Sequence, residues 1–317
     1  MVDNELPRVA VMMSTYNGHR YLKEQLNSIL AQSGVVVKCY IRDDGSTDDT
    51  LTVVRAYCQN HPEQIILFEG ENIGCKASFR LLAGLVYEID GEKPHDYYSF
   101  CDQDDVWLQD KLTSAARALS NHDQALPLLY FSNLTLVDAD LKVIKNAYKN
   151  EEASISKANA IIEEFGTGCT MVFNRRALSL FLSFKPDISI FHDRWLYLLC
   201  VYAGQVVYDK HSYIYYRQHG SNVVGISISC NNALWRHALS LCGPAERGKY
   251  AVAKEFLKQY EAILDKNDIR NIRLYTEYRN SLWDKFKFLT FGYICGIRMR
   301  KFKQDLWLRV LIILGRA

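Results

Sequence analysis

Short apolar runs alternate with amphipathic segments through the first half of this 317-residue chain. Such an alternation predicts successive βαβ units, and therefore an α/β fold with a mostly parallel, Rossmann-like sheet and helices on both faces. The expected strands are 8–13, 35–41, 64–68 and 97–101, and the expected helices are 21–32, 48–60, 77–89 and 107–119.

The pattern changes after Pro127, where 128–137 and 141–144 are predicted to form a strand pair. Further predicted elements are helices at 156–164, 176–184 and 193–202, and β-structure at 168–173, 206–208 and 212–216. Beyond about Cys230 the sequence favours long helices and shows no strand pattern. We therefore expect an α/β domain at 1–229 and a helical region at 230–317.

Composition and charge exclude several classes of protein. Hydrophobic residues make up 49% and charged residues 23%, the balance of a globular chain rather than a disordered one. The net charge of +2 gives no overall field that would attract nucleic acid. No G-x-G-x-x-G follows the first strand, which argues against a dinucleotide oxidoreductase, and no glycine-rich phosphate loop supports nucleotidyl transfer.

Cysteine usage and hydropathy indicate a cytoplasmic protein. The nine cysteines form no C-x-x-C pair, which predicts reduced thiols rather than a zinc ribbon or a disulfide framework. The start, MVDNELPRVAVMM, lacks the basic end of a signal peptide. No run of about 18 apolar residues is present, so we expect no membrane span.

Polar residues follow three of the predicted strands and begin one helix. The segments are STYNG at 14–18, RDDGSTD at 42–48, CDQDD at 101–105 and FHD at 191–193. Each could be an ordinary turn, because Asp, Asn, Gly and Ser favour turns. Ligands of parallel sheets bind at the carboxyl ends of the strands, so the recurrence favours a binding site.

The acidic cluster after the fourth predicted strand has two interpretations. Asp102, Asp104 and Asp105 repel one another unless a cation lies between them, and Mg²⁺ or Mn²⁺ prefers such oxygen ligands. A metal there would neutralise a departing diphosphate. The alternative is an acidic helix start that interacts favourably with the helix dipole. Spacing alone does not separate the two.

A set of motifs carries a family resemblance over about residues 9–225. The motifs are VMMSTYNG, IRDDGSTDDT, ENIGCKASF, FCDQDDVWLQDKL, FGTGCTMVFNR, FHD and YYRQHGSN. In this order the chain resembles an inverting GT-A glycosyltransferase of family 2. The motifs FCDQDDVW and YRQHGSN make it similar to the bacterial rhamnosyltransferase type.

The resemblance implies a nucleotide site at the strand ends. Its residues would be Ser14, Thr15, Tyr16, Asn17, Asp43, Asp44 and Asp102. Asp44 would accept the N3–H of the base, which is chemically reasonable because uracil and thymine offer a donor there.

The resemblance also implies a divalent metal, Mg²⁺ or Mn²⁺, at a D-x-D motif. Asp104 would contact the metal directly, and Asp105 and His219 are further candidate ligands. His219 could equally be an ordinary exposed loop histidine. Arg217 is a candidate diphosphate contact because of its fork of donors, with a surface salt bridge as the alternative.

Asp193 matches the general base of the family, with a helix N-cap as its alternative role. The preceding residue is often acidic in the family and is His192 here, which could tune Asp193 or bind the acceptor. Trp195 is either a core residue or a platform for an acceptor sugar.

The resemblance as a whole implies a metal-dependent inverting transferase that builds a surface polysaccharide on a lipid-linked glycan. The implied donor is dTDP-L-rhamnose. Another UDP- or dTDP-sugar, such as galactose or glucose, is the alternative donor. A glycan-binding protein on a decayed transferase fold is the non-enzyme alternative.

The C-terminal segment has an unusual charge. Residues 283–317 contain eight Lys or Arg against two Asp, with seven aromatic side chains among them. This pattern is typical of a segment that lies on an anionic membrane without spanning it, here the inner face of the cell membrane. The alternative is a helix that packs on the catalytic domain.

Overall fold

The computed structural model describes residues 5–91, 93–146, 155–163, 165–187, 189–220, 244–299 and 302–313. The expected domain boundary at 229/230 and the last two residues of YYRQHGSN lie outside the described residues. The fold and the site below are built from the described ranges.

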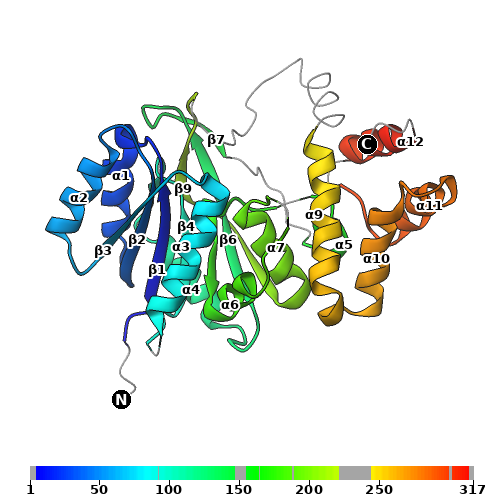
Figure 1. The fold of residues 1–317 in the computed structure, drawn as a ribbon, viewed down its shortest axis with the longest axis horizontal. Helices are drawn as coiled ribbons and strands as arrows, with labels where there is room; N and C mark the ends of the chain where they lie inside the picture. The colour runs from blue at the N-terminus through cyan, green and yellow to red at the C-terminus, as the bar shows by residue number, and fades with distance from the viewer. Residues whose placement is uncertain are drawn as a thin grey trace.

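One mixed sheet forms the centre of the molecule (Figure 1). Its strands are β1 (Arg8–Thr15), β2 (Val36–Asp44), β3 (Ile65–Gly70), β4 (Tyr97–Cys101), β5 (Val106–Trp107), β6 (Leu128–Val137), β7 (Val143–Asn146), β8 (Val172–Asn174) and β9 (Gln205–Arg217). Among the described residues these nine strands have the order β3-β2-β1-β4-β8-β6-β9-β5, and β7 pairs with β6. The first four strands along the chain are parallel to one another, as are β6 and β9. The expected α/β class is therefore confirmed.

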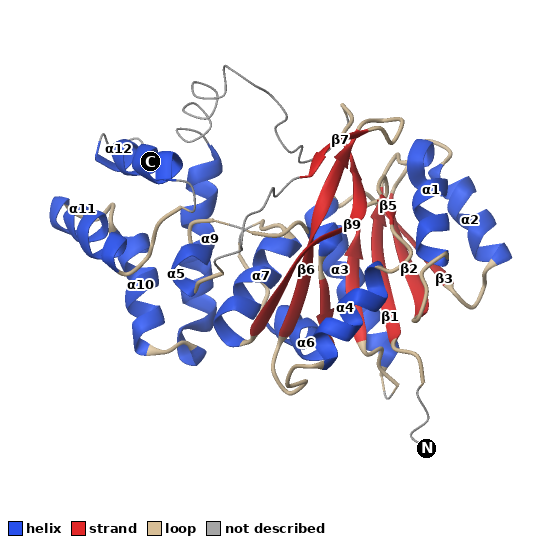
Figure 2. Cartoon of the chain, turned by 180° about the vertical axis from the view of Figure 1, so that it is seen from behind, coloured by secondary structure: helices blue, strands red, loops and turns tan. Residues whose placement is uncertain are grey.

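Helices cover both faces of the sheet (Figure 2). They are α1 (His19–Leu30), α2 (Thr50–Asn60), α3 (Cys75–Asp90), α4 (Lys111–Ser120), α5 (Lys157–Ala160), α6 (Arg175–Ser183) and α7 (His192–Ala203). Strand β1 shows why two layers form, because successive side chains of a strand point to opposite faces. Val9, Val11 and Met13 pack with α1 and α4, whereas Ala10 and Met12 pack with α3, α6 and α7.

Two expected elements differ in the structure. The helix expected at 107–119 begins only at Lys111, because Val106 and Trp107 pair with Tyr215 and Ile214 of β9. The β-segments expected at 206–208 and 212–216 form the single strand β9, whose pairing with β6 shifts register between them. In both places long-range strand pairing overrides the local pattern.

Two shorter elements are also smaller than expected. Helix α5 has one turn instead of the nine residues predicted from 156 to 164. The strand expected at 168–173 is a 3₁₀ turn, η1 (Gly168–Thr170), followed by β8.

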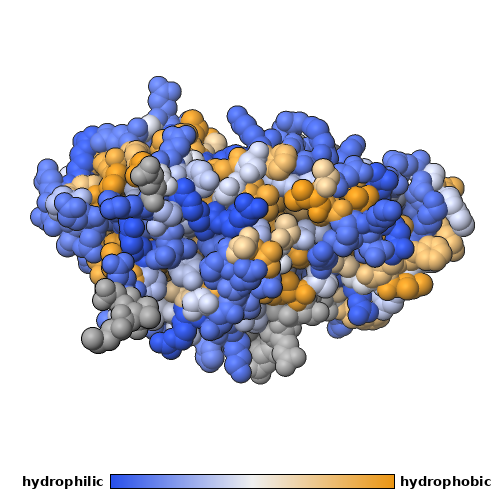
Figure 3. All heavy atoms as spheres, turned by 90° about the horizontal axis from the view of Figure 1, so that it is seen from below, coloured by the Kyte–Doolittle hydropathy of each residue, from blue (hydrophilic) through white to orange (hydrophobic). Residues whose placement is uncertain are grey.

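The C-terminal helices pack on the α/β core. They are α9 (Pro244–Tyr260), η2 (Glu261–Ile263), α10 (Lys266–Glu277), α11 (Leu282–Lys287), the π-helical turn η3 (Phe288–Gly292) and α12 (Phe302–Ile313). The Trp195 ring of α7 lies 5.7 Å from Phe256 and 5.8 Å from Tyr260 of α9. Figure 3 shows hydrophobic surface at the end of the molecule that carries α10 and α11.

None of the helices in the described ranges has the length and hydropathy that crossing a bilayer would need. Seven of the nine cysteines are described, and all seven are free thiols. The remaining two, Cys230 and Cys242, lie outside the described residues.

Candidate active site

Adjacent parallel strands bring the polar strand ends to one edge of the sheet. In the β1–β2 pair Thr15 lies opposite Asp43, and in the β1–β4 pair Met13 lies opposite Cys101, which directly precedes Asp102. The segments 14–18, 42–48 and 101–105 therefore meet where such sheets bind their ligands.

Hydrogen bonds between the first two strand ends fix the loops against each other. Asp43 accepts from the hydroxyls of Thr15 at 2.9 Å and Ser46 at 2.6 Å. Asn17 has a positive φ of 48°, which Asn tolerates better than most residues, and its N–H donates to Ser46 Oγ at 3.0 Å. The Thr47 N–H in turn donates to Asn17 Oδ1 at 2.8 Å. These hydrogen bonds hold the loops after β1 and β2 in place in the absence of a ligand.

Asp44 connects the end of β2 to the loop before α3. Its carboxylate pairs with Arg42 and accepts the N–H groups of Ile73 at 3.0 Å and Gly74 at 2.8 Å. Gly74 has φ +83°, a conformation that favours glycine and that aims its N–H at the carboxylate. The role of Asp44 as acceptor for the nucleotide base stays a prediction.

Gln103 holds the chain at Tyr16, a role that the sequence did not reveal. Its Oε1 accepts the Tyr16 N–H at 2.9 Å, and its Nε2 donates to the Tyr16 carbonyl at 3.0 Å. A Cβ at Gly18 would lie 2.2 Å from Gln103 Oε1, so this contact needs glycine. The Tyr16 side chain stays 46% exposed beside the strand ends, whereas the Ser14 hydroxyl turns inward to Ser78 at 2.6 Å.

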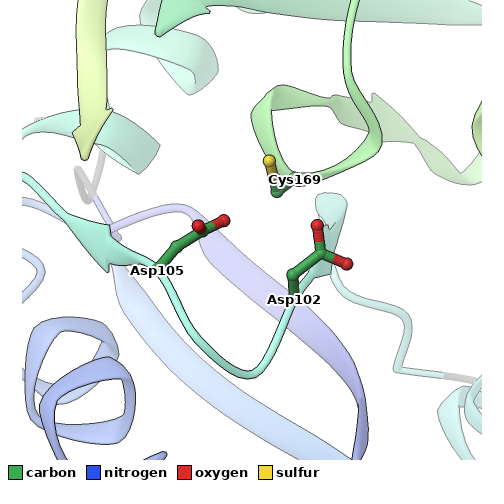
Figure 4. A group of neighbouring side chains, drawn as sticks. All are labelled: Asp102, Asp105 and Cys169. Atoms are coloured by element: carbon green, nitrogen blue, oxygen red, sulfur yellow. The ribbon is translucent and has the colours of Figure 1, made fainter. Parts of the chain in front are cut away.

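Two carboxylates and a thiol face one another at the end of β4 (Figure 4). The ligand atoms of Asp102, Asp105 and Cys169 all lie within 4.8 Å of one another. Burial and the charge of Asp104 raise the pKa of Asp102 to about 7 and that of Asp105 well above its usual value. Asp105 is fully buried, and its Oδ2 has no hydrogen-bond partner among the described residues. Such an atom is costly unless a ligand satisfies it.

His219 reaches this acidic cluster from the far end of β9. Its Nε2 lies 2.8 Å from Asp104 Oδ2, and its ring lies 4.9 Å from that of Tyr21. The imidazole is therefore not an ordinary exposed loop side chain. Asp104 and His219 present an oxygen and a nitrogen side by side, and the oxygen is a ligand that Mn²⁺ prefers.

Arg217 anchors the cluster instead of offering its guanidinium to a diphosphate. Its side chain is 2% exposed and pairs with Glu24, and its Nε donates to the Asp104 carbonyl at 2.8 Å. Its backbone N–H donates to Asp105 Oδ1 at 3.0 Å. The expectation of a diphosphate contact is not supported, because these partners already engage the guanidinium.

Lys111 is a buried cation beneath the cluster that the sequence analysis missed. Its ammonium lies 3.6 Å from the centre of the Trp107 ring and donates to Ser99 Oγ at 3.3 Å. Burial lowers its pKa to about 8, while the nearby Asp105 acts in the opposite direction. One signal was available, because Lys111 lies four residues before Ala115 on the buried face of α4.

The donor set fits a hard divalent cation. Asp102 and Asp105 supply carboxylate oxygens beside the Cys169 thiol. Asp104 and His219, which contact each other at 2.8 Å, are further candidate ligands next to this group. The raised pKa of Asp102 and the orphan Oδ2 of Asp105 both indicate negative charge that the chain itself does not fully compensate. The metal's identity is not fixed by these groups.

Asp193 lies in the first turn of α7 and faces the turn η1. Its Oδ2 accepts the Gly168 N–H at 3.2 Å, and its Oδ1 accepts the Arg194 N–H at 2.8 Å. The N-cap position belongs to Phe191, so capping is not the role of Asp193. A Cβ on Gly168 would lie 3.0 Å from His192 Nε2 and 3.2 Å from Asp193 Oδ2, so glycine leaves room for the carboxylate.

Acidic residues of three segments act electrostatically on one thiol at the start of α3. Burial and the charges of Asp102, Asp193 and Asp44, in that order, raise the pKa of the Cys75 thiol to about 12. Asp193 also acts on Asp102 and raises its pKa. Carboxylates that lie up to 149 residues apart in the sequence therefore converge at one edge of the sheet.

His192 is a buried neutral histidine rather than an acceptor contact. Its ring lies 4.0 Å from that of Phe79 and 4.4 Å from that of Phe100, and it is 7% exposed. Burial lowers its pKa below 6.5, although the charge of Asp193 opposes the shift.

This burial predicts a pH-dependent stability. Below pH 6.5 the unfolded chain protonates His192 and the folded chain does not, so the free energy of unfolding falls as the pH decreases. We expect this slope to be steeper than in His192→Gln by up to about 1.4 kcal/mol per pH unit. Urea unfolding between about pH 7.5 and 5.5 measures it. Equal slopes in the two proteins would contradict the assignment.

Trp195 belongs to the core. It is 1% exposed and packs against Phe256 and Tyr260 of α9. Of the two roles considered for it, stacking on an acceptor sugar is excluded in this structure because no face of the ring is accessible.

A Rossmann-like sheet with an acidic cluster after β4 and an opposed carboxylate at a helix start defines the GT-A class of glycosyltransferases. Residues 10–181 match the family model Glycosyl transferase family 2. The chain therefore belongs to glycosyl transferase family 2 and is a glycosyltransferase.

Individual relatives agree with this assignment. A dTDP-rhamnosyl transferase, RfbG, of Shigella flexneri is 31% identical over 231 residues, which are 68% of this chain and 75% of that protein. An uncharacterized glycosyltransferase of a Nostoc species is 26% identical and spans 87% of this chain and 84% of its own length.

Solved structures show the same fold. TarS of S. aureus (residues 1–349, in complex with UDP-GlcNAc) has a TM-score of 0.55 at 16% identity and covers 98% of this chain and 93% of its own. The mannosyltransferase PcManGT of Pyrobaculum calidifontis, in complex with GDP-Man and Mn²⁺, has a TM-score of 0.52 at 15% identity, with 98% and 86% covered.

Proposed function

We propose that this glycosyltransferase moves L-rhamnose from dTDP-L-rhamnose to a hydroxyl of a lipid-linked glycan, with inversion at the anomeric carbon. One observation carries the proposal of transfer at this site. Asp193 accepts the Gly168 N–H, and the thiol of the next residue, Cys169, lies within 4.8 Å of the Asp102 and Asp105 carboxylates at the ligand-binding edge of the sheet. The likeness to the dTDP-rhamnosyl transferase of Shigella flexneri supports the choice of donor.

The nucleotide would bind over the ends of β1 and β2. The exposed ring of Tyr16 offers a face on which a base can stack, and Gln103 holds the backbone beneath it. Thr15 and Asn17 belong to the hydrogen-bonded loops at these strand ends. Asp43 and Asp44 place negative charge beside these loops, which suits a base that offers an N–H donor.

Asp193 would act as the general base. It would accept the proton of the acceptor hydroxyl while that oxygen attacks the anomeric carbon from the face opposite the nucleotide. The bond to the acceptor oxygen forms, the bond to the diphosphate breaks, and the single displacement inverts the stereocentre. The Gly168 N–H donates to Oδ2 and so orients the carboxylate.

A divalent cation at Asp102, Asp104, Asp105 and His219 would supply positive charge to the departing diphosphate. Arg217 would hold this ligand set in place through its contacts with the Asp104 carbonyl and Asp105. Arg217 is thus a positioning residue for the cluster.

The acceptor and the cellular role extend the same proposal. A lipid-linked acceptor would be presented at the inner face of the cell membrane, and the product would be a surface polysaccharide. A different UDP- or dTDP-sugar would use the same catalytic groups, because sugar selectivity depends on pocket shape.

The donor can be tested by thermal shift with Mn²⁺ present. We expect dTDP-L-rhamnose to raise the melting temperature more than dTDP-glucose, UDP-glucose, UDP-galactose or UDP-GlcNAc, because binding to the folded state alone stabilises it. Release of the corresponding nucleoside diphosphate, dTDP or UDP, on adding a glycan acceptor should follow the same ranking. A larger shift and faster release with a UDP-sugar would reject the rhamnose assignment and keep the transferase.

A further inference from the structure

Exposed apolar side chains are concentrated at the C-terminal end of the described chain. Half of the large hydrophobic residues that are exposed in the described structure lie between 282 and 313, a segment of about a tenth of the chain. Single exposed apolar residues are normal on protein surfaces, but a cluster of them indicates a binding surface.

Helix α11 and the π-helical turn η3 form one continuous helical segment whose outer side is apolar. Leu282 is 84%, Trp283 62% and Phe286 50% exposed, and Phe291 and Ile294 follow at 53% and 77%. The spacing from Trp283 to Phe286 is one helical turn, and the wider π-turn places Phe291 five residues further on. We call these five side chains the C-terminal apolar stripe.

The opposite side of the same segment explains why the stripe points outward. Phe288 is fully buried, and its ring lies 5.7 Å from that of Tyr275 and 5.3 Å from that of Tyr278. Arg309 donates to the Leu289 carbonyl at 3.0 Å and so fixes the turn to α12. The segment is anchored by its inner side, and the stripe does not contribute to the core.

Cations flank the stripe. The carboxylates of Asp284 and Asp305 are each paired, with Lys287 at 3.0 Å and Arg309 at 2.8 Å. Lys285 and Arg298 have no ion pair within the described part of the chain, and Arg298 lies 5.5 Å from the centre of the Tyr293 ring. Positive charge next to aromatic and aliphatic side chains complements an anionic bilayer surface, where acyl chains lie beneath negative headgroups.

Helix α12 repeats the arrangement. Phe302, Leu306 and Ile313 are 71%, 52% and 61% exposed, and their spacings of four and seven residues place them on one side of the helix. Lys303 is exposed beside them. In the described residues neither α11 with η3 nor α12 is long enough to cross a bilayer. The segment would therefore lie on the membrane surface.

We propose that the C-terminal apolar stripe docks the protein on an anionic lipid bilayer, with Trp283 and Phe286 inserted among the headgroups and Lys285 and Arg298 facing their phosphates. This inference concerns binding alone and does not depend on the donor or on the transfer reaction. Membrane contact and packing on the catalytic domain are then both true of the segment, because one side packs on the core and the other contacts the membrane.

Vesicle flotation of the full chain tests the proposal. We expect binding to phosphatidylcholine vesicles that contain about one third phosphatidylglycerol, and much weaker binding to phosphatidylcholine alone. Trp283→Ser/Phe286→Ser should reduce binding by about tenfold or more. Lys285→Gln should reduce it by about fivefold, and added salt should remove that difference.

Matched controls keep the result specific. Leu81→Ser/Ile89→Ser removes apolar residues that are similarly exposed, at 46% and 50%, on the distant helix α3, and should leave vesicle binding unchanged. Lys210→Gln does the same for charge. Equal loss in the control and stripe variants would overturn the proposal.

A second outcome would also overturn it. If the chain binds no vesicles and sediments as a dimer that Trp283→Ser/Phe286→Ser dissociates, the stripe is a contact between two copies of the chain. Melting temperatures of all variants within about 3 °C of the wild type would show that altered folding is not the cause.

Discussion

Replacing Asp193 with Asn is expected to reduce the turnover number by about 10²- to 10⁴-fold, the usual contribution of a general base. Asn has nearly the shape of Asp but does not accept the proton of the acceptor hydroxyl. Its Oδ1 can still accept the Gly168 N–H, so the first turn of α7 should stay in place. Release of nucleoside diphosphate in the presence of an acceptor measures the loss.

Two comparisons make this result interpretable. Nucleotide binding by Asp193→Asn, followed by thermal shift, should match the wild type, because the proposed general base would lie opposite the nucleotide rather than hold it. Asp187→Asn is the matched control, since Asp187 is exposed and pairs only with Lys258 in the described structure. Near-normal turnover in Asp193→Asn would show that Asp193 is not the general base.

The parallel part of the fold could be predicted because it is local. Each βαβ unit of the first hundred residues carries its own period, two for strands and 3.6 for helices, so a short window reveals it. The start of α4 could not be found in this way. Trp107 reads as part of an amphipathic helix but pairs with Ile214 of β9, more than a hundred residues away.

The same distinction divides the candidate site. Asp102, Asp104 and Asp193 lie in short sequence motifs. The position of these motifs after the strands and at a helix start was enough to predict that they meet at one edge of the sheet. Arg217 was given a ligand-binding role because its chemistry suits diphosphate, whereas the structure engages it with Glu24, on a helix at the other end of the chain. An ion-pair partner so far away in the sequence cannot be predicted from a local sequence pattern.

Burial of a polar side chain is the second feature of the site that the sequence does not predict. Lys111 was overlooked because a lysine on an amphipathic helix is ordinarily solvated, and here it is fully buried beside Asp105 and Trp107. Its burial becomes reasonable only once the acidic cluster above it is known, because the negative charge offsets part of the cost of desolvating an ammonium group.

Asp104→Asn is expected to separate activity from stability. Burial raises the pKa of both Asp102 and Asp105, and the charge of Asp104 raises them further, as expected for carboxylates that repel one another. Removing that charge should lower turnover by about 10²-fold or more, because the proposed metal near the departing diphosphate would lose a ligand. In EDTA, however, the variant should be at least as stable as the wild type, since it relieves repulsion in a buried cluster.

Thermal unfolding with and without metal measures both effects. Mn²⁺ should raise the melting temperature of the wild type and of Asp187→Asn, and EDTA should abolish their activity, because a cation bound only by the folded chain stabilises it. Asp104→Asn should show little shift with Mn²⁺, and so should His219→Ala, which removes the nitrogen 2.8 Å from Asp104 Oδ2. Full turnover in EDTA would remove the metal from the reaction. A full Mn²⁺ shift in both variants would place the metal elsewhere, because Asp104 and His219 contact each other only at this cluster in the described structure.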